Sequence, residues 1–324
     1  MRILSVILLC LLLIPPWSGR PRLDLLPPVA AVTATPVALD WRDPDRTRLG
    51  RLTFLGGVHL TGPSPAFGGF SAMIVRGDRF TLLSDGGNIV RFRLDSRWRI
   101  SDARFGALPD GPGRGWHKSD RDSESLTIDP ATGTLWVGFE RANQLWRYSP
   151  GFAAAQGHVT PPAMADWPEN GGAESLVRLR DGSFIVLSES KRAGKGGDFR
   201  GIWFAGDPLN APRRGFTFAY RPPAGFRATD MAELPDGRLM VLNRRASLES
   251  GFTAVLTILP RRAILAGKVA SGVEIARFAA PVVHDNFEAL AVTQEGDATI
   301  LWIASDDNQL FLQRSLLLKF RLND

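Results

Sequence analysis

The chain has 324 residues, a formal net charge of +6 and an apolar fraction of 44%. This length and composition can supply a full hydrophobic core, which excludes a low-complexity chain. The lysines and arginines are dispersed, so the basic tract with interleaved aromatic residues that would indicate nucleic-acid binding is missing. Cys10 is the only cysteine, which excludes a disulfide framework.

The first 35 residues are predicted to be a secretory signal or an N-terminal anchor. Met1-Arg2 precedes an apolar run, Ile3 to Ile14, and two prolines follow it. A basic start, an apolar stretch of this length and a breaker are typical of a secretory signal, not of a full membrane span. Val32-Thr33-Ala34 is a small-residue candidate cleavage site, but it lies far from the apolar run, so an uncleaved anchor is the alternative. We expect a periplasmic or secreted protein whose only contact with a membrane is through such an anchor.

Five segments repeat one layout from about Leu52 to the C-terminus. Each begins with a short strand, turns at a glycine-containing tip, returns through an apolar strand and leaves through a third strand after a polar loop. The tips carry the Asp-Gly chemistry of tight hairpins. The segments begin at Ser71, Glu124, Glu174, Thr229 and Glu288.

A fourth short strand is predicted between repeats, for example at Ala103–Leu108 or Gly215–Tyr220. Four strands per unit and a period of roughly 50 residues predict an all-β protein, a five-bladed β-propeller over residues 36–324. Arg51–Leu60 has no repeat of its own, so we expect it to form the outer strand of the last blade and close the ring. The alternatives are a sixth blade within Ser96–Asp122 or Gly151–Asn170, and a β-sandwich or a pair of small β domains.

Polar side chains recur at two positions of the repeat. The first set opens strand one and comprises Ser71, Glu124, Glu174, Asp230 and Glu288. The second set ends strand two and comprises Asp85, Glu140, Glu189, Asn243 with Arg244, and Asp306-Asp307-Asn308. Because the hairpin tip lies between the two sets, both are expected at the same end of every blade. Strand one is usually innermost in a propeller, so the pattern predicts two concentric polar rings at one mouth of the channel.

Carboxylates that converge on one mouth raise each other's pKa values unless a cation compensates them. Ca²⁺ is a candidate because it takes roughly six to eight oxygen ligands. The candidate metal ligands are Asp85, Glu124, Glu140, Glu174, Glu189, Asp230, Asp285, Glu288 and Asp306, with Asp122 and Asp307 as further candidates. Basic residues beside the second ring are the internal alternative. For any single acid, a hydrogen bond to a backbone N–H group of the next blade is the structural alternative.

Four motifs of the repeats are DSESLTID from Asp122, NGGAESLV from Asn170, DNFEALAV from Asp285 and SDDNQLFLQRSLLLKFRL from Ser305. These motifs resemble the phytase-like family, which is also described as having esterase-like activity. The resemblance covers about Leu52 to the C-terminus and departs at Ala289, where the family usually has glycine. Members of this family are mostly exported bacterial proteins. The resemblance therefore implies a propeller fold and the hydrolysis of phosphoesters or other esters. In the similar β-propeller phytases, an acidic calcium cluster on one face binds phosphate.

By analogy with these phytases, we expect a monomeric hydrolase of small-molecule phosphate esters or other esters, with Ca²⁺ as its cofactor. The candidate catalytic carboxylates are Glu124, Glu174 and Glu288. The candidate substrate-binding residues are Arg141, Lys191, Arg244 and Arg245. Arginine suits this role because its paired donors match phosphate oxygens.

Two other function classes remain open from the sequence. The first is a non-catalytic propeller of the cell envelope that binds a ligand or a protein, with structural calcium. The second is a serine-type carboxylesterase with Ser71 as its nucleophile, although Met73 stands where a nucleophile elbow has glycine. Its base would come from among His59, His117, His158 and His284.

Overall fold

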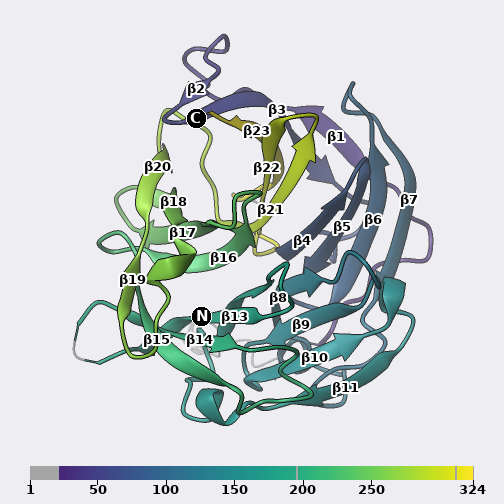
Figure 1. The fold of residues 1–324 in the computed structure, drawn as a ribbon. Coiled ribbons are helices and arrows are strands. Elements are labelled where there is room, and N and C mark those ends of the chain that lie inside the picture. The colour runs from purple at the N-terminus through teal and green to yellow at the C-terminus, as the bar shows by residue number, and fades with distance from the viewer. Residues whose placement is uncertain (1–21, 195, 311, 324) are drawn as a thin grey trace, which may run out of the picture.

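The computed structural model describes residues 22–194, 196–310 and 312–323, and these residues form five sheets arranged in a ring (Figure 1). The innermost strand of each sheet contacts the innermost strands of both neighbouring sheets, so the ring is closed. The predicted five-bladed all-β propeller is therefore confirmed.

Each of the first four blades contains four antiparallel strands, which follow one another from the channel outward. Blade one contains β4 (Phe70–Arg76), β5 (Arg79–Ser84), β6 (Asn88–Leu94) and β7 (Ile100–Ala107). Blade two contains β8 (Ser123–Ile128), β9 (Leu135–Phe139), β10 (Gln144–Tyr148) and β11 (Ala155–Val159). Blade three contains β12 (Ala173–Arg178), β13 (Phe184–Arg192), β14 (Phe199–Phe204) and β15 (Gly215–Arg221), with β19 (Val269–Ser271) parallel to β15. Blade four contains β16 (Arg227–Glu233), β17 (Leu239–Ser247), β18 (Gly251–Leu259) and β20 (Val273–Phe278).

Blade five combines strands from both ends of the chain. It contains β21 (Phe287–Glu295), β22 (Ala298–Ser305), β23 (Ser315–Leu322) and β3 (Leu52–Thr61), with β1 (Thr33–Pro36) and β2 (Arg48–Leu49) paired to β3. β3 pairs antiparallel with β23, from Leu60 opposite Ser315 to Leu52 opposite Leu322. The strand predicted to close the ring does so.

The two connections that offered room for a sixth blade supply outer strands instead. Ser96–Asp122 contains β7 and Gly151–Asn170 contains β11, so a sixth blade is excluded within the described residues. The helices of this part of the chain are four one-turn 3₁₀ segments: η1 (Lys118–Asp120), η2 (Pro150–Phe152), η3 (Pro162–Met164) and η4 (Arg261–Ala263). Among the described residues, no helix has the length and hydropathy of a membrane span.

The predicted targeting segment lies mostly in residues 1–21, outside the described residues. Residues 22–36 follow the surface of the propeller. The Leu23 N–H donates to the Trp116 carbonyl (3.0 Å), and the Asn88 side-chain amide donates to the Asp24 carbonyl (2.9 Å). The candidate cleavage site Val32–Ala34 includes Thr33 and Ala34, the first two residues of β1, and it ends just before the expected domain boundary at residue 36.

Five hydrophobic clusters hold the blades together, one between each pair of neighbours within the described residues. Because both faces of each sheet are covered, the middle strands are near-continuous apolar runs, such as Leu239–Leu242. Trp136, Trp146 and Trp302 are buried in these clusters. Packing uses the faces of the sheets, so the edge of each inner strand is left facing the channel.

Candidate functional site

A β-bulge interrupts every inner strand near its start, at the third residue of β16 and at the second residue of the other four, and there two residues oppose one on the partner strand. The bulge residues are Ser71, Glu124, Glu174, Thr229 and Glu288, and we call them the inner ring. A second position lies one residue beyond the partner of the residue that precedes each bulge. Its occupants are Asp85, Glu140, Glu189, Arg244 and Asp306, and we call them the outer ring. A bulge re-aims the local side chain, so the repeated acids acquire one repeated direction.

Two predicted ring positions in blade four need correction. Thr229 occupies the inner-ring position, and Asp230 lies one residue further along β16. Both Asp230 carboxylate oxygens accept backbone N–H groups, from Met231 (2.7 Å) and from Leu290 in blade five (2.7 Å). Asp230 also lines a cavity of about 540 Å³ among residues that lead to the hairpin tips, at the other end of the channel. Asn243 is fully buried and accepts a hydrogen bond from the Tyr220 hydroxyl (2.8 Å), so Arg244 takes the outer-ring position.

The two rings face one shared space. Burial raises the pKa of Glu124 well above its ordinary value, and the charges of Glu174 and Glu288 raise it further. Glu174 behaves in the same way, with Glu189 and Glu140 as its strongest charged neighbours. Because these residues belong to three different blades, they meet across the channel instead of lining separate faces.

Three carboxylates of this space are close enough to share one ion. One oxygen each from Asp122, Glu124 and Glu140 lies within 4.8 Å of the other two. Burial raises the pKa of Asp122 and of Glu140, so each charge is costly without a cation. A set of carboxylate oxygens suits a hard cation such as Ca²⁺ better than a metal that prefers nitrogen or sulfur ligands. Asp85 supports this fit, because its Oδ1 atom is buried with no hydrogen-bond partner among the described residues.

Arg244 neutralises the other side of the mouth. Its guanidinium contacts Glu189 of blade three (2.7 Å) and Glu288 of blade five (3.1 Å), and it donates to the Asn286 side chain (2.6 Å). Burial lowers the pKa of Arg244, but the charges of Glu288 and Glu189 outweigh this effect and raise it. Burial raises the pKa of Glu288, Arg244 opposes this, and the result is a pKa of about 7.

The remaining predicted ligands lie at blade five. Asp306 accepts hydrogen bonds from the Asn308 N–H (2.6 Å) and the Asn286 side chain (3.2 Å), and burial raises its pKa well above the ordinary value. Asp285 pairs with Arg314 (3.5 Å). Asp307 accepts the N–H of Gly69 (2.9 Å), which ties blade five to blade one. Of these three, Asp306 lies in the outer ring, and the other two are held by Arg314 and by the Gly69 N–H group.

The four predicted substrate-binding cations have partners already. Arg141 pairs with Asp122 (2.8 Å), and Arg244 joins Glu189 to Glu288. Lys191 pairs with Asp166 (2.7 Å), an exposed acid outside both rings. The Arg245 guanidinium lies over the Phe226 ring, 5.0 Å from its centroid. Arg141 and Arg244 therefore face the acidic mouth, and the other two are engaged outside the rings.

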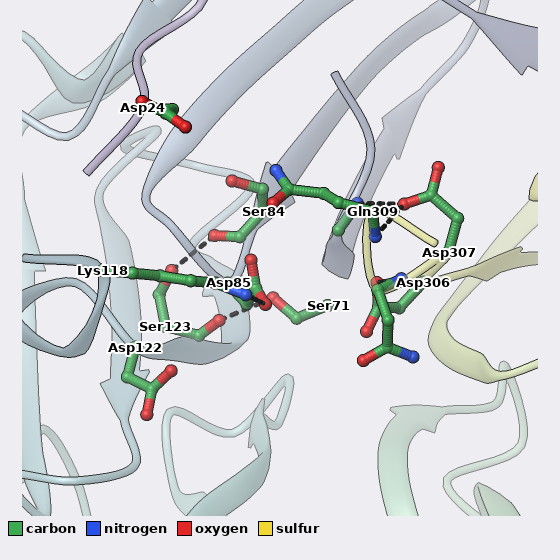
Figure 2. Close-up of polar contacts among 12 residues, drawn as sticks. Asp24, Ser71, Ser84, Asp85, Lys118, Asp122, Ser123, Asp306, Asp307 and Gln309 are labelled. Atoms are coloured by element: carbon green, nitrogen blue, oxygen red, sulfur yellow. Dashed lines mark hydrogen bonds and ion pairs between the residues drawn. The ribbon is translucent and has the colours of Figure 1, made fainter. Parts of the chain in front are cut away.

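Lys118 is a cation of the mouth that the sequence pattern did not reveal. It opens η1 in the connection before β8, and its ammonium forms an ion pair with Asp85 (Figure 2). This connection lies between two blades, outside the repeated segments, so a comparison of repeats passes over it. The available signal was a lysine four residues before Asp122, in a loop that leads into an inner strand.

Ser71 has a structural role rather than the exposure of a nucleophile. It is 1% exposed, and its hydroxyl donates to the Ser123 carbonyl of blade two (2.6 Å; Figure 2). Thr229, at the same ring position, donates to the Phe287 carbonyl of blade five (3.2 Å). The hydroxyl members of the inner ring thus join neighbouring blades by donating to backbone carbonyls.

Comparison with known proteins gives a family and several distant structural similarities. The family model "Phytase-like: Esterase-like activity of phytase" matches residues 65–309. The search of curated proteins returned no match.

Three solved structures show the range of these similarities. The Myxococcus xanthus glutaminyl cyclase has a TM-score of 0.45 and 9% identity, over 92% of this chain and 99% of that one. The β-propeller domain of Myceliophteria thermophila Cps50 (Swd1) has a TM-score of 0.37 and 12% identity, over 77% and 71%. The Kuenenia stuttgartiensis hydrazine synthase has a TM-score of 0.36 and 12% identity over 75% of this chain, which spans 57% of the length of that one. Because the family model covers more than half of the sequence, the chain belongs to the phytase-like family.

Proposed function

We propose that the protein is an exported hydrolase that acts on phosphate esters at the acidic mouth of its propeller, with Ca²⁺ as its metal. The observation that carries this proposal is the group Asp122, Glu124 and Glu140, whose oxygens lie within 4.8 Å of one another. Membership of the phytase-like family supports hydrolysis of an ester. The basic start and the apolar run Ile3 to Ile14 support export.

Asp122, Glu124 and Glu140 would hold the ion, with Glu174 and Asp85 beside them. Bound Ca²⁺ would neutralise these carboxylates and polarise a phosphoryl oxygen of the substrate. The Arg141 guanidinium is 45% exposed and pairs with Asp122, so it can turn toward a phosphoryl oxygen that arrives from solvent.

Glu288 is the residue best suited to move a proton. Its pKa of about 7 lets a carboxylate oxygen accept a proton from an attacking water near neutral pH and release it afterwards. Arg244 fixes the position of this carboxylate through its 3.1 Å contact and through Asn286. Burial and the charges of Glu189, Glu140 and Glu288 raise the pKa of Glu174, so a cation bound at the inner ring would favour the ionised form of this carboxyl.

The test is phosphate release from a panel of phosphomonoesters, measured with Ca²⁺ and with a chelator. We expect turnover that depends on Ca²⁺ and falls at least ~100-fold in Glu124→Gln, since a lost ligand weakens both the metal and the substrate site. Glu295→Gln, at an exposed hairpin tip, is the matched control and should leave turnover unchanged. The absence of Ca²⁺-dependent phosphate release from every substrate would refute the proposal.

A non-catalytic propeller that binds a ligand in the cell envelope is the second candidate. One observation favours it: each of the four cations predicted to bind phosphate already has a partner. Ca²⁺ would then raise the melting temperature without turnover of any phosphate ester or aryl ester. In the same assays, an unchanged rate of aryl-ester hydrolysis in Ser71→Ala would exclude the serine-type carboxylesterase.

A further inference from the structure

Lys118 places a positive charge of the protein itself among the acids of the mouth. Its ammonium pairs with Asp85, and Figure 2 shows the side chain reaching from its loop toward that carboxylate. Burial lowers the pKa of Lys118, but the charges of Asp85, Asp306 and Asp122 raise it to above its ordinary value. The side chain is therefore a permanent cation at the pH of any ordinary assay.

The backbone around Lys118 is held in place by contacts within its loop. The Asp120 carboxylate accepts the N–H groups of Trp116 (3.0 Å) and His117 (3.2 Å) at the start of η1. The Arg121 guanidinium closes the same loop by donating to the Pro112 carbonyl (2.5 Å). These contacts fix the backbone position of Lys118 and so limit where its ammonium can lie.

The N-terminal segment adds a second restraint to this loop. The Leu23 N–H donates to the Trp116 carbonyl (3.0 Å), and Arg22 forms an isolated β-bridge with His117. Both contacts lie within two residues of Lys118. The chain just after residue 21 therefore helps to set where the ammonium sits.

Asp85 is the acid at which the contact with the Lys118 ammonium matters most for metal binding. It is 9% exposed, one oxygen pairs with Lys118, and the other has no hydrogen-bond partner among the described residues. A divalent cation held by Asp122, Glu124 and Glu140 would lie near the ammonium, because Asp122 lies beside Asp85 and Lys118 (Figure 2) and its charge raises the pKa of both groups. Two cations this close repel each other strongly in a partly buried site.

We propose that Lys118 is a tethered cation that competes with a divalent cation for the acidic mouth, so that metal binding displaces its ammonium from Asp85. This inference rests on the cation site of the proposed function, but not on catalysis. It explains how the mouth can hold so many acids without a metal. It also means that the affinity for the metal is set below what the carboxylates alone would give.

The test is the affinity for Ca²⁺, measured by titration calorimetry on the full chain. Lys118→Met should bind Ca²⁺ on the order of tenfold more tightly than the unaltered protein, because the competing charge is gone. Lys118→Gln, which keeps a polar side chain, should do the same and serves as a second variant if the first does not fold. Lys319→Met is the matched control, since it also removes an ion-paired lysine (Lys319 to Glu295, 2.7 Å) but lies outside the rings, and it should change the affinity less than twofold.

A labelling experiment on the unaltered protein gives an independent readout. Displacement of the Lys118 ammonium by Ca²⁺ should increase its acetylation by acetic anhydride, with Lys319 as the internal reference. The inference would be overturned if both Lys118 variants bound Ca²⁺ with equal or weaker affinity than the unaltered protein, or if Ca²⁺ protected Lys118 from labelling. It would also be overturned if neither the variants nor the unaltered protein bound Ca²⁺ at concentrations up to ~10 mM. The phosphate-release assay reports separately on the proposed function, so Ca²⁺-dependent turnover with unaltered affinity in the variants would sink this inference alone.

Discussion

Replacing Arg244 by methionine should destabilise the protein strongly, and more at alkaline than at acidic pH. Arg244 is 18% exposed and lies 2.7 Å from Glu189 and 3.1 Å from Glu288, whose side chains are 14% and 11% exposed. Removing one partner of a buried ion pair leaves an uncompensated charge, which costs about 3–5 kcal/mol. Methionine fills much of the same volume, so the loss reports the charge and not a cavity.

The pH dependence follows from the direction of the pKa shift. Arg244 lowers the pKa of Glu288 to about 7, so its loss moves that pKa higher. At pH 5 Glu288 is protonated with or without Arg244, and the difference in free energy of unfolding should shrink; at pH 8 it should be largest.

Urea-induced unfolding in the presence of chelator, followed by tryptophan fluorescence, measures this difference. Arg238→Met is the control, because Arg238 pairs with Asp236 at 2.6 Å on the surface (42% and 48% exposed), where such pairs contribute about 0–1 kcal/mol. If Arg244→Met and Arg238→Met have equal effects at pH 8, Arg244 is not the counter-ion of the mouth.

Three further predictions concern the mouth and its surroundings. In chelator, the free energy of unfolding should fall as the pH rises from about 4.5 to 7, because Glu288 keeps a proton in the folded protein that it releases in the unfolded chain. Added Ca²⁺ should make this pH dependence weaker. A free energy of unfolding that rises from pH 5 to pH 8 would contradict the prediction. Gly68→Ala should lose about 1–3 kcal/mol, because Gly68 has a φ of +118° and its added Cβ would overlap the Asp307 carboxylate; in thermal unfolding, Gly237→Ala, with a φ of +84° and open space at its Cβ, should lose less. Asp230→Ala should lose about 2 kcal/mol, because the Leu290 and Met231 N–H groups lose their acceptor, while calorimetry should show an unchanged Ca²⁺ affinity; a tenfold weaker affinity would return Asp230 to the metal site.

The fold could be predicted from the sequence because each repeat contains its own turn and strand signals within about 50 consecutive residues. Each hairpin tip carries its own turn residues, and each middle strand is apolar on both faces, so period and turn chemistry were enough to give five blades. Arg51–Leu60 was identified as the closing strand because no repeat contained it. Outer strands such as β11 (Ala155–Val159) were harder to assign, because half-exposed edge strands have little apolar pattern.

The acidic mouth could be predicted in its outline but not in its register. Glu124, Glu174 and Glu288 share a position, and the sequence is enough to align them. In blade four, Asp230 looks like their equivalent, but the bulge falls at Thr229. A bulge adds one residue without any change in residue type, so its place depends on hydrogen bonds across strands that the sequence does not display. Lys118 was missed for a similar reason, since its position depends on how a long connection folds back.

The pairing of β3 with β23 has a mechanical consequence. Like charges at the mouth push the five blades apart, and the blades can separate only where the ring is joined without a covalent link. That junction is the β3–β23 ladder, from Leu60 opposite Ser315 to Leu52 opposite Leu322, so its hydrogen bonds resist opening of the ring. The ladder cannot form until β23 (Ser315–Leu322) has been made, and the closed ring then holds its acids together against their own repulsion.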